Sequence, residues 1–154
     1  MKRPNLLILG AWLLQATAWF VPVVKLDKFS LSVPGWEAFL STASELWLSG
    51  DTHFTSWYAA VLSAVSVTTT VVFLAASPWV VWRGSRAVQR TSAWIAAAFF
   101  VFNAHWLFLL GQDRSDLRSG YFLWWLSFAL LAIGLFDLAG WSRVDQTAKK
   151  VAAT

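Results

Sequence analysis

The sequence predicts an all-α membrane protein, a four-helix up-down transmembrane bundle with one amphipathic helix in its first outer loop. Three observations predict this class. The chain of 154 residues is 58% hydrophobic and 13% charged, which is too apolar for a soluble domain of this length. Four apolar stretches are each long enough to cross a bilayer. Basic residues are concentrated on one side of these stretches and acidic residues on the other. We therefore expect a single integral membrane domain over 1–154.

The four stretches are predicted as transmembrane helices over about 5–24, 54–82, 93–111 and 120–141. At a rise of ~1.5 Å per residue, about 20 residues cross ~30 Å of hydrocarbon. The second stretch has 29 residues without a formal charge, so we expect it to tilt or to extend beyond the bilayer. The connecting segments are short, which makes consecutive helices antiparallel neighbours.

The first stretch has a second interpretation. Lys2 and Arg3, a short apolar run and the sequence Ala16-Thr17-Ala18 resemble a secretory signal peptide with its cleavage site. Apolar residues continue from Trp19 through Val24, which favours a complete span that is retained. The sequence leaves open whether residues 1–18 are cleaved.

Between the first two stretches, an amphipathic helix is predicted over about 34–48. Pro34 suits the first helical turn, where its missing N–H costs nothing, and Gly50 is expected to end the helix. This helix is expected to lie flat across the mouth of the bundle or to present its aromatic face to a partner. The residues expected to bind that partner are Trp36, Phe39, Leu40 and Trp47.

The charge distribution predicts the orientation of the helices. The N-terminus, the 83–92 segment, the inner end of the last helix and the tail, 142–154, hold eight basic and two acidic residues, a net charge of +6. The outer segments hold four basic and six acidic residues, a net charge of −2. The positive-inside rule therefore puts both termini in the cytoplasm of a bacterium, with the protein in the inner membrane. The basic residues form no patch, so we expect no nucleic-acid binding and take the lipid bilayer as the first partner.

Tryptophan supports the same layout. Most of the twelve tryptophans lie near predicted helix ends, as expected for aromatic belts at headgroup depth. A platform for ligand stacking is the alternative interpretation, and membrane anchoring is favoured over it because the positions follow the helix ends.

Small residues recur at helical spacing in the second stretch. They are Ala59, Ser63, Ser66, Thr70 and Ser77. Small residues let membrane helices approach closely, whereas their hydroxyls could alternatively line a polar path. Packing is favoured, because Ser and Thr can return their hydrogen bonds to the helix backbone, but the sequence leaves both roles open.

Few residues of the sequence are candidates for a chemical role. The intramembrane polar residues are Gln15, Asn103 and His105. Such residues are candidates for function, but helix packing is a sufficient reason for each. His53 and His105 have no carboxylate pair or HxxxH spacing beside them, so we predict no metal site and no cofactor. The chain has no Cys and no charge in the middle of a stretch, so we predict no catalytic residues and no enzyme activity.

Two short motifs carry a resemblance to known proteins. The run VPGWEAF occupies 33–39 and the run GYFLWWLS occupies 120–127. This pattern resembles that of uncharacterised small bacterial four-helix inner-membrane proteins. The resemblance implies the same fold, and it carries no functional residue with it. The layout of a long first and a short second outer loop also resembles claudin-like tetraspans, in topology only, because their cysteine signature is absent.

We expect a non-enzymatic integral inner-membrane protein that acts by binding. It would be an accessory, assembly or binding subunit of a membrane complex, with its outer loop as the contact and another membrane protein or a second copy as partner. Two other classes stay open. One is a small oligomeric transporter or pore, lined by Gln15 and the Ser/Thr face of the second helix. The other is a membrane immunity-type protein that blocks a toxin.

Overall fold

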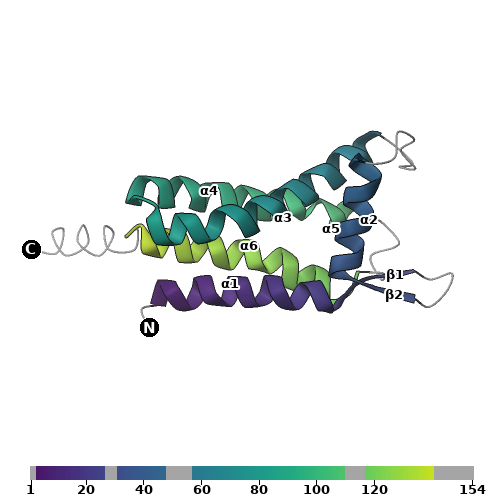
Figure 1. Ribbon diagram of the computed structural model, residues 1–154, viewed down its shortest axis with the longest axis horizontal. Coiled ribbons are helices and arrows are strands. Elements are labelled where there is room, and N and C mark those ends of the chain that lie inside the picture. The colour runs from purple at the N-terminus through teal and green to yellow at the C-terminus, as the bar shows by residue number, and fades with distance from the viewer. Residues whose placement is uncertain (1–2, 27–30, 48–56, 110–116, 141–154) are drawn as a thin grey trace, which may run out of the picture.

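The computed structural model describes residues 3–26, 31–47, 57–109 and 117–140 (Figure 1). In these residues the chain is mostly helical, with one short hairpin. The elements are α1 (Arg3–Phe20), β1 (Pro22–Leu26), β2 (Leu31–Pro34), α2 (Gly35–Trp47), α3 (Trp57–Arg83), α4 (Arg86–Asn103), α5 (His105–Leu109) and α6 (Ser119–Leu138). The amphipathic helix expected over 34–48 corresponds to α2.

Within the described residues, three helical segments are long and apolar enough to cross a membrane. They are Ala60–Arg83 in α3, Arg86–Phe108 across α4 and α5, and Ser119–Leu138 in α6. Helix α1 is not one of them. It has 18 residues, and it begins with the polar run Arg3-Pro4-Asn5, which lowers its mean hydropathy. The structure thus shows a helical protein with three helices that could span a membrane.

Helix α1 ends at Phe20 rather than near 24, which corrects the predicted first stretch. Pro22 has no backbone N–H and so cannot continue the helix. The β-branched Val23 and Val24 then favour an extended backbone. Hydropathy does not separate an apolar strand from the last turn of an apolar helix, and for that reason the all-α prediction missed this strand.

Strand β1 pairs with β2 in an antiparallel hairpin, from Pro22↔Pro34 to Leu26↔Leu31. The hairpin is tied to the start of α6, because the Arg118 N–H donates to the Val23 carbonyl at 2.9 Å. Gly35 follows β2 directly and begins α2, and its N–H donates to the Val21 carbonyl at 3.3 Å. A Cβ on Gly35 would collide with the Ala18 carbonyl. Glycine is therefore what lets the start of α2 lie on the end of α1.

The other helix boundaries also differ from the predicted ones. Only Gly84 and Ser85 separate α3 from α4, so most of the expected 83–92 loop is helix. Ser85 caps α4 by accepting a hydrogen bond from the Val88 N–H at 3.4 Å, a position where Ser is favoured. The third predicted helix therefore begins at Arg86 rather than 93.

The last helix ends at Leu138, three residues before the predicted 141. The cause is local. Gly140 has a positive φ of 83°, the left-handed conformation that commonly terminates helices, and its N–H donates to the Asp137 carbonyl at 3.2 Å.

The long helices run lengthwise in Figure 1, with α1 beside α6 and α4 on the other side of α6. The core lies where these helices meet. Its centre is Phe128, which is 0% exposed and makes edge-to-face ring contacts with Phe73 of α3, Phe99 of α4 and Trp124 of α6. The turn between α3 and α4, the start of α1 and the end of α6 share one end of the molecule. The hairpin and α2 lie at the opposite end, where α2 runs across the long helices (Figure 1).

Candidate functional site

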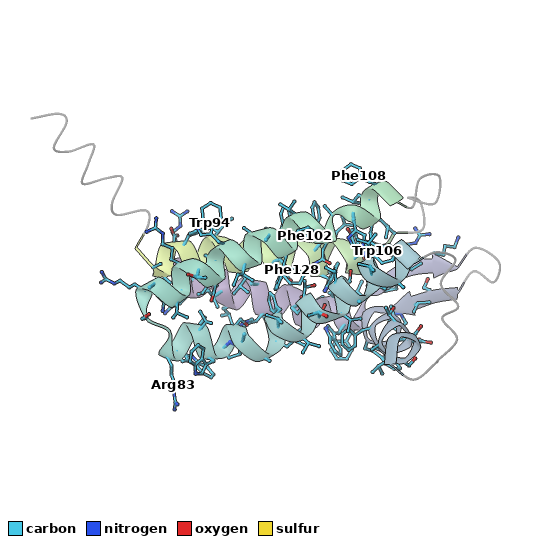
Figure 2. The ribbon with its side chains drawn as sticks, turned by 90° about the horizontal axis from the view of Figure 1, so that it is seen from above. Arg83, Trp94, Phe102, Trp106, Phe108 and Phe128 are labelled. Carbon is cyan, nitrogen blue, oxygen red and sulfur yellow. The ribbon has the colours of Figure 1, made fainter. Side chains whose placement is uncertain are left out.

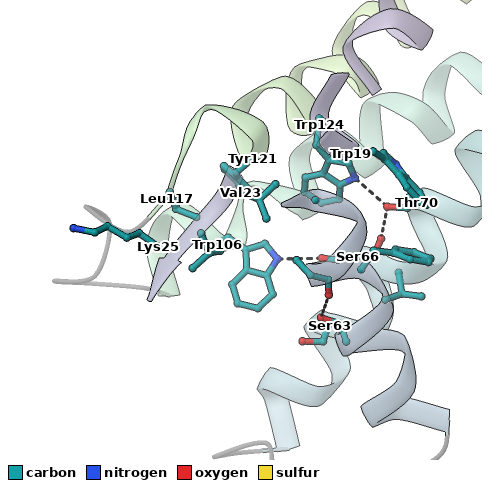
Figure 3. A pocket seen from close by; sticks show the side chains of 17 residues that line it. Trp19, Val23, Lys25, Ser63, Ser66, Thr70, Trp106, Leu117, Tyr121 and Trp124 are labelled. Atoms are coloured by element: carbon teal, nitrogen blue, oxygen red, sulfur yellow. Dashed lines mark hydrogen bonds between the residues drawn. The ribbon is translucent and has the colours of Figure 1, made fainter. Parts of the chain in front are cut away.

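A cavity of about 480 Å³ lies under α2, at the end of the molecule that carries the hairpin (Figure 3). It is partly open. Its walls come from the end of α1, from β1, from the inner face of α2, and from α3, α5 and α6. The lining residues are Ala18, Trp19, Val23, Val24, Lys25, Gly35, Ala38, Phe39, Thr42, Ser63, Ser66, Val67, Thr70, Trp106, Leu117, Tyr121 and Trp124.

The walls are mainly aromatic and aliphatic. Trp19 of α1 packs on Phe39 of α2 with ring centroids 5.4 Å apart, which holds the roof of the cavity to its side wall. Tyr121 and Trp124 lie on neighbouring turns of α6 with centroids 5.8 Å apart. Among the described lining residues Lys25 is the only charged one, and its amino group points away from the cavity in Figure 3. The interior is therefore uncharged.

The indole N–H groups of two tryptophans are already bonded to hydroxyl groups of α3. Trp106 donates to Ser66 Oγ at 3.1 Å and Trp124 donates to Thr70 Oγ1 at 3.0 Å (Figure 3). Each hydroxyl in turn donates onward, Ser66 to Asn103 Oδ1 at 3.1 Å and Thr70 to the Ser66 carbonyl at 2.8 Å. These bonds fix the orientation of both rings and satisfy both indole N–H groups within the protein.

Asn103 is the centre of this polar network. It is 0% exposed, and its amide donates to Thr69 Oγ1 at 3.0 Å and to the Phe99 carbonyl at 2.9 Å. Its backbone carbonyl accepts a hydrogen bond from the Tyr121 hydroxyl at 2.7 Å. The predicted polar residue of the third helix thus joins α3, α4 and α6 just behind the cavity wall.

The other two predicted polar residues lie elsewhere. Gln15 is 1% exposed between α1 and α6, and its Oε1 accepts from the Ser127 hydroxyl at 2.7 Å. Within the described residues its Nε2 has no hydrogen-bond partner. The Nδ1 of His105 lies 2.6 Å from the Phe102 carbonyl, and its ring packs on Trp106. Neither side chain lines the cavity.

In the part of the chain that the structure describes, no group of three or more His, Asp or Glu side chains is placed to hold a metal ion. His53, the possible partner of His105, lies outside the described residues. What the cavity offers chemically is apolar surface with a few hydroxyl oxygens.

The structure separates the residues predicted to bind a partner. Trp36 is 42% and Leu40 is 54% exposed, one turn apart on the outer face of α2. Phe39 points the other way, into the cavity and against Trp19. The side chain of Trp47 lies outside the described residues. The set expected as one surface therefore divides into an outer stripe, Trp36 and Leu40, and an inner wall that includes Phe39.

The Ser/Thr face of α3 is buried. Ser63 is 3%, Thr70 is 3% and Ser77 is 5% exposed. Ser77 accepts a hydrogen bond from Trp12 Nε1 at 3.0 Å, so tryptophans from α1, α5 and α6 bond to this face. The sequence showed the spacing of the hydroxyls, but no pattern in it paired them with tryptophans 40 to 65 positions away.

Comparisons with protein-family models, with curated proteins and with solved structures find no match to this chain.

Proposed function

We propose that this protein is a non-enzymatic binding subunit of a membrane complex, held in the bacterial inner membrane and contacting its partner through the outer face of α2. One observation carries the proposal. The stripe of Trp36 and Leu40 is exposed although α2 is fixed in place at its start, where the Gly35 N–H bonds to the Val21 carbonyl. Exposed aromatic and aliphatic side chains on a fixed element are typical anchors of protein interfaces.

The rest of the outer face of α2 is suited to a specific interface rather than to nonspecific hydrophobic association. Glu37, Ser41 and Ser44 are exposed beside the stripe, so polar side chains surround the two apolar ones. A hydrophobic centre with a polar rim is the usual anatomy of a reversible interface. The acidic residue makes docking onto anionic lipid headgroups unfavourable.

The hydrogen bonds of the Ser/Thr face favour the binding role over a pore. Ser66, Thr70 and Ser77 accept from tryptophan N–H groups and are buried or half-buried. Hydroxyls engaged in this way serve helix packing, whereas a conducting path needs them free to contact water or solute.

We also propose four spans with both termini in the cytoplasm, with α1 as the first and shortest span. In support, α1 lies alongside the candidate span α6. Arg3 at the start of α1, Arg83 at the end of α3 and Arg86 at the start of α4 share one end of the molecule, where Figure 2 labels Arg83. A Lys/Arg-rich end of this kind is expected to face the cytoplasm.

Capture of the partner tests the binding role. The tagged full-length chain is purified from bacterial membranes in mild detergent, and the double variant Trp36→Ala/Leu40→Ala is compared with Ser41→Ala/Ser44→Ala on the same face. We expect a stoichiometric membrane-protein partner that decreases at least tenfold with the first variant and is retained with the second. Isolation of a homo-oligomer alone, or equal recovery with both variants, would contradict the proposal.

Single cysteines test the topology, because the chain has none of its own. Ser41→Cys should react with a membrane-impermeant maleimide in intact spheroplasts, whereas Ser85→Cys should react only after lysis. The reverse pattern would overturn the orientation.

A further inference from the structure

We infer that the cavity under α2 is a binding site for the hydrocarbon chain of a membrane lipid. This inference does not rest on the proposed partner of α2, because the cavity is lined by the inner face of that helix and the partner stripe lies on the outer face.

The cavity has the size of a small-molecule binding site. A volume of about 480 Å³ falls within the ~300–1,000 Å³ of typical small-molecule sites. An α-helix is about 10–12 Å wide and needs a long open groove. The cavity instead has α2 as a roof across it, so a folded segment of another protein does not fit, whereas a flexible chain does.

The lining of the cavity is mostly apolar. The inward-facing surface is mainly aromatic and aliphatic, and two of the three indole N–H groups on the lining, those of Trp106 and Trp124, are bonded to Ser66 and Thr70. The one charged lining residue among those described, Lys25, directs its amino group away (Figure 3). A surface that is mostly apolar and carries no inward-directed charge favours an apolar ligand over a charged one.

Part of the cavity lies beside the middle of α3. Val67 and Thr70 line the cavity, and both lie close to the middle of α3, which spans Trp57–Arg83. At ~1.5 Å per residue, Thr70 lies roughly 20 Å from the start of this helix. If α3 spans the bilayer, this part of the cavity is at the depth of the hydrocarbon. The bilayer then supplies acyl chains at very high local concentration directly beside the site.

The roof contacts explain how the chain would be retained. Phe39 and Ala38 of α2 lie over the space, and Phe39 is held by its contact with Trp19. A chain inserted between this roof and Val67 would contact protein on several sides. It would therefore exchange more slowly with the bulk lipid than the chains that cover the exposed surfaces of α3 and α4.

Photolabelling tests the inference on the full-length protein. The chain is reconstituted in nanodiscs of phosphatidylethanolamine and phosphatidylglycerol, with a trace of phosphatidylethanolamine that carries a diazirine on one acyl chain. After irradiation, adducts are mapped by peptide mass spectrometry. We expect adducts on cavity residues such as Val67 and Phe39, in addition to those on Val71 and Leu74, which are exposed on α3.

Two variants of α2 provide the matched comparison. Ala38→Phe fills the cavity from its roof, and Ser41→Phe adds the same side chain to the exposed face. The cavity adducts should fall at least tenfold in Ala38→Phe and stay unchanged in Ser41→Phe, with the adducts on Val71 and Leu74 constant in both. Thr42→Phe, also on the lining, serves if Ala38→Phe does not fold.

The wild-type map decides the matter by itself if neither filled variant folds. Adducts confined to exposed residues, or adducts on a second protein chain at the cavity, would overturn the inference. So would cavity adducts that persist undiminished in a folded, filled variant. Loss of partner capture in the experiment on Trp36 and Leu40 would leave the lipid site unaffected.

Discussion

The contact of α1 with α6, the close contact, differs in construction from the contact of α3 with the same two helices, the wide contact. Where α1 meets α6, small residues let the backbones approach, and a Cβ on Gly134 would lie 2.7 Å from Ile8 Cγ1. Where α3 meets α1 and α6, large side chains bridge the gap, with Trp12 reaching Ser77 and Trp124 reaching Thr70. The difference shows that side-chain volume at the contact sets the distance between helices.

The two contacts also differ in how completely their buried amide groups are hydrogen-bonded. The close contact contains one buried amide, Gln15, whose Nε2 is without a hydrogen-bond partner among the described residues. Asn103, on α4, borders the wide contact, and its side-chain oxygen and nitrogen are both bonded to α3, to Ser66 and Thr69. Because the backbones do not pack closely in the wide contact, side-chain hydrogen bonds contribute more to its stability. It is also the contact that leaves room for the cavity.

The largest expected effect is at the close contact. Gly134→Ala should lower the free energy of unfolding by about 2–3 kcal/mol, as expected for overpacking, because the new Cβ would lie 2.7 Å from Ile8 Cγ1 and 3.2 Å from Ile8 N. Gly10→Ala on the facing helix is the control. Its Cβ would lie 3.7 Å from Leu130 Cδ1, an ordinary contact, so stability should stay the same or rise slightly. Unfolding in mixed micelles measures both variants, and equal losses would mean that α1 and α6 are not closely packed there.

A smaller effect should distinguish the two amides. Asn103→Leu should cost about 1–2 kcal/mol, because Ser66 and Thr69 lose a partner inside the protein. Gln15→Leu removes a buried donor that has no partner among the described residues, and Ser127 Oγ lies 2.6 Å from the Trp124 carbonyl, which can replace Gln15 as its acceptor. Its free energy of unfolding should therefore stay within about 0.5 kcal/mol or increase. The same micelle titration compares the two, and a larger loss for Gln15→Leu would show that Gln15 stabilises the fold more than Asn103 does.

The smallest effect is expected at the end of the close contact. Arg3 Nε lies 3.5 Å from Asp137 Oδ2, and the arginine side chain is 82% exposed. Exposed ion pairs contribute little, so Arg3→Gln should change the free energy of unfolding by less than about 0.5 kcal/mol. Added salt should reduce this difference further. A loss above 1 kcal/mol that persists in high salt would show that the pair is shielded from solvent.

The sequence predicted the local features well where a local cause exists. The amphipathic helix expected over 34–48 is α2, Gly35–Trp47, because helical spacing acts over a few residues. Pro34 is the last residue of β2 rather than part of the first helical turn. The third helix was placed seven residues late, since Arg86 and Arg90 were assigned to a loop by their charge, although Ser85 caps a helix there. The hairpin was missed because Pro22 and two valines end α1 inside a continuous apolar run.

The candidate site was predicted only in its parts. Spacing marked Ser63, Ser66 and Thr70 as one face, and amphipathicity marked Phe39 as an apolar residue of the outer helix. That Phe39 points inward while Leu40 points outward depends on which side of α2 meets Trp19. That orientation depends on the bond from the Gly35 N–H to the Val21 carbonyl, a contact with another element that helical spacing within α2 does not encode.

By itself the sequence determined the class of the protein, mostly helical with long apolar helices, because hydropathy and helix-terminating residues act within each segment. The tertiary structure alone decided which helices pack closely, which tryptophan bonds to which hydroxyl, and where a space is left. These outcomes depend on the volumes of side chains that meet from distant positions, such as Trp124 with Thr70, and a single segment contains no record of the partner it will meet.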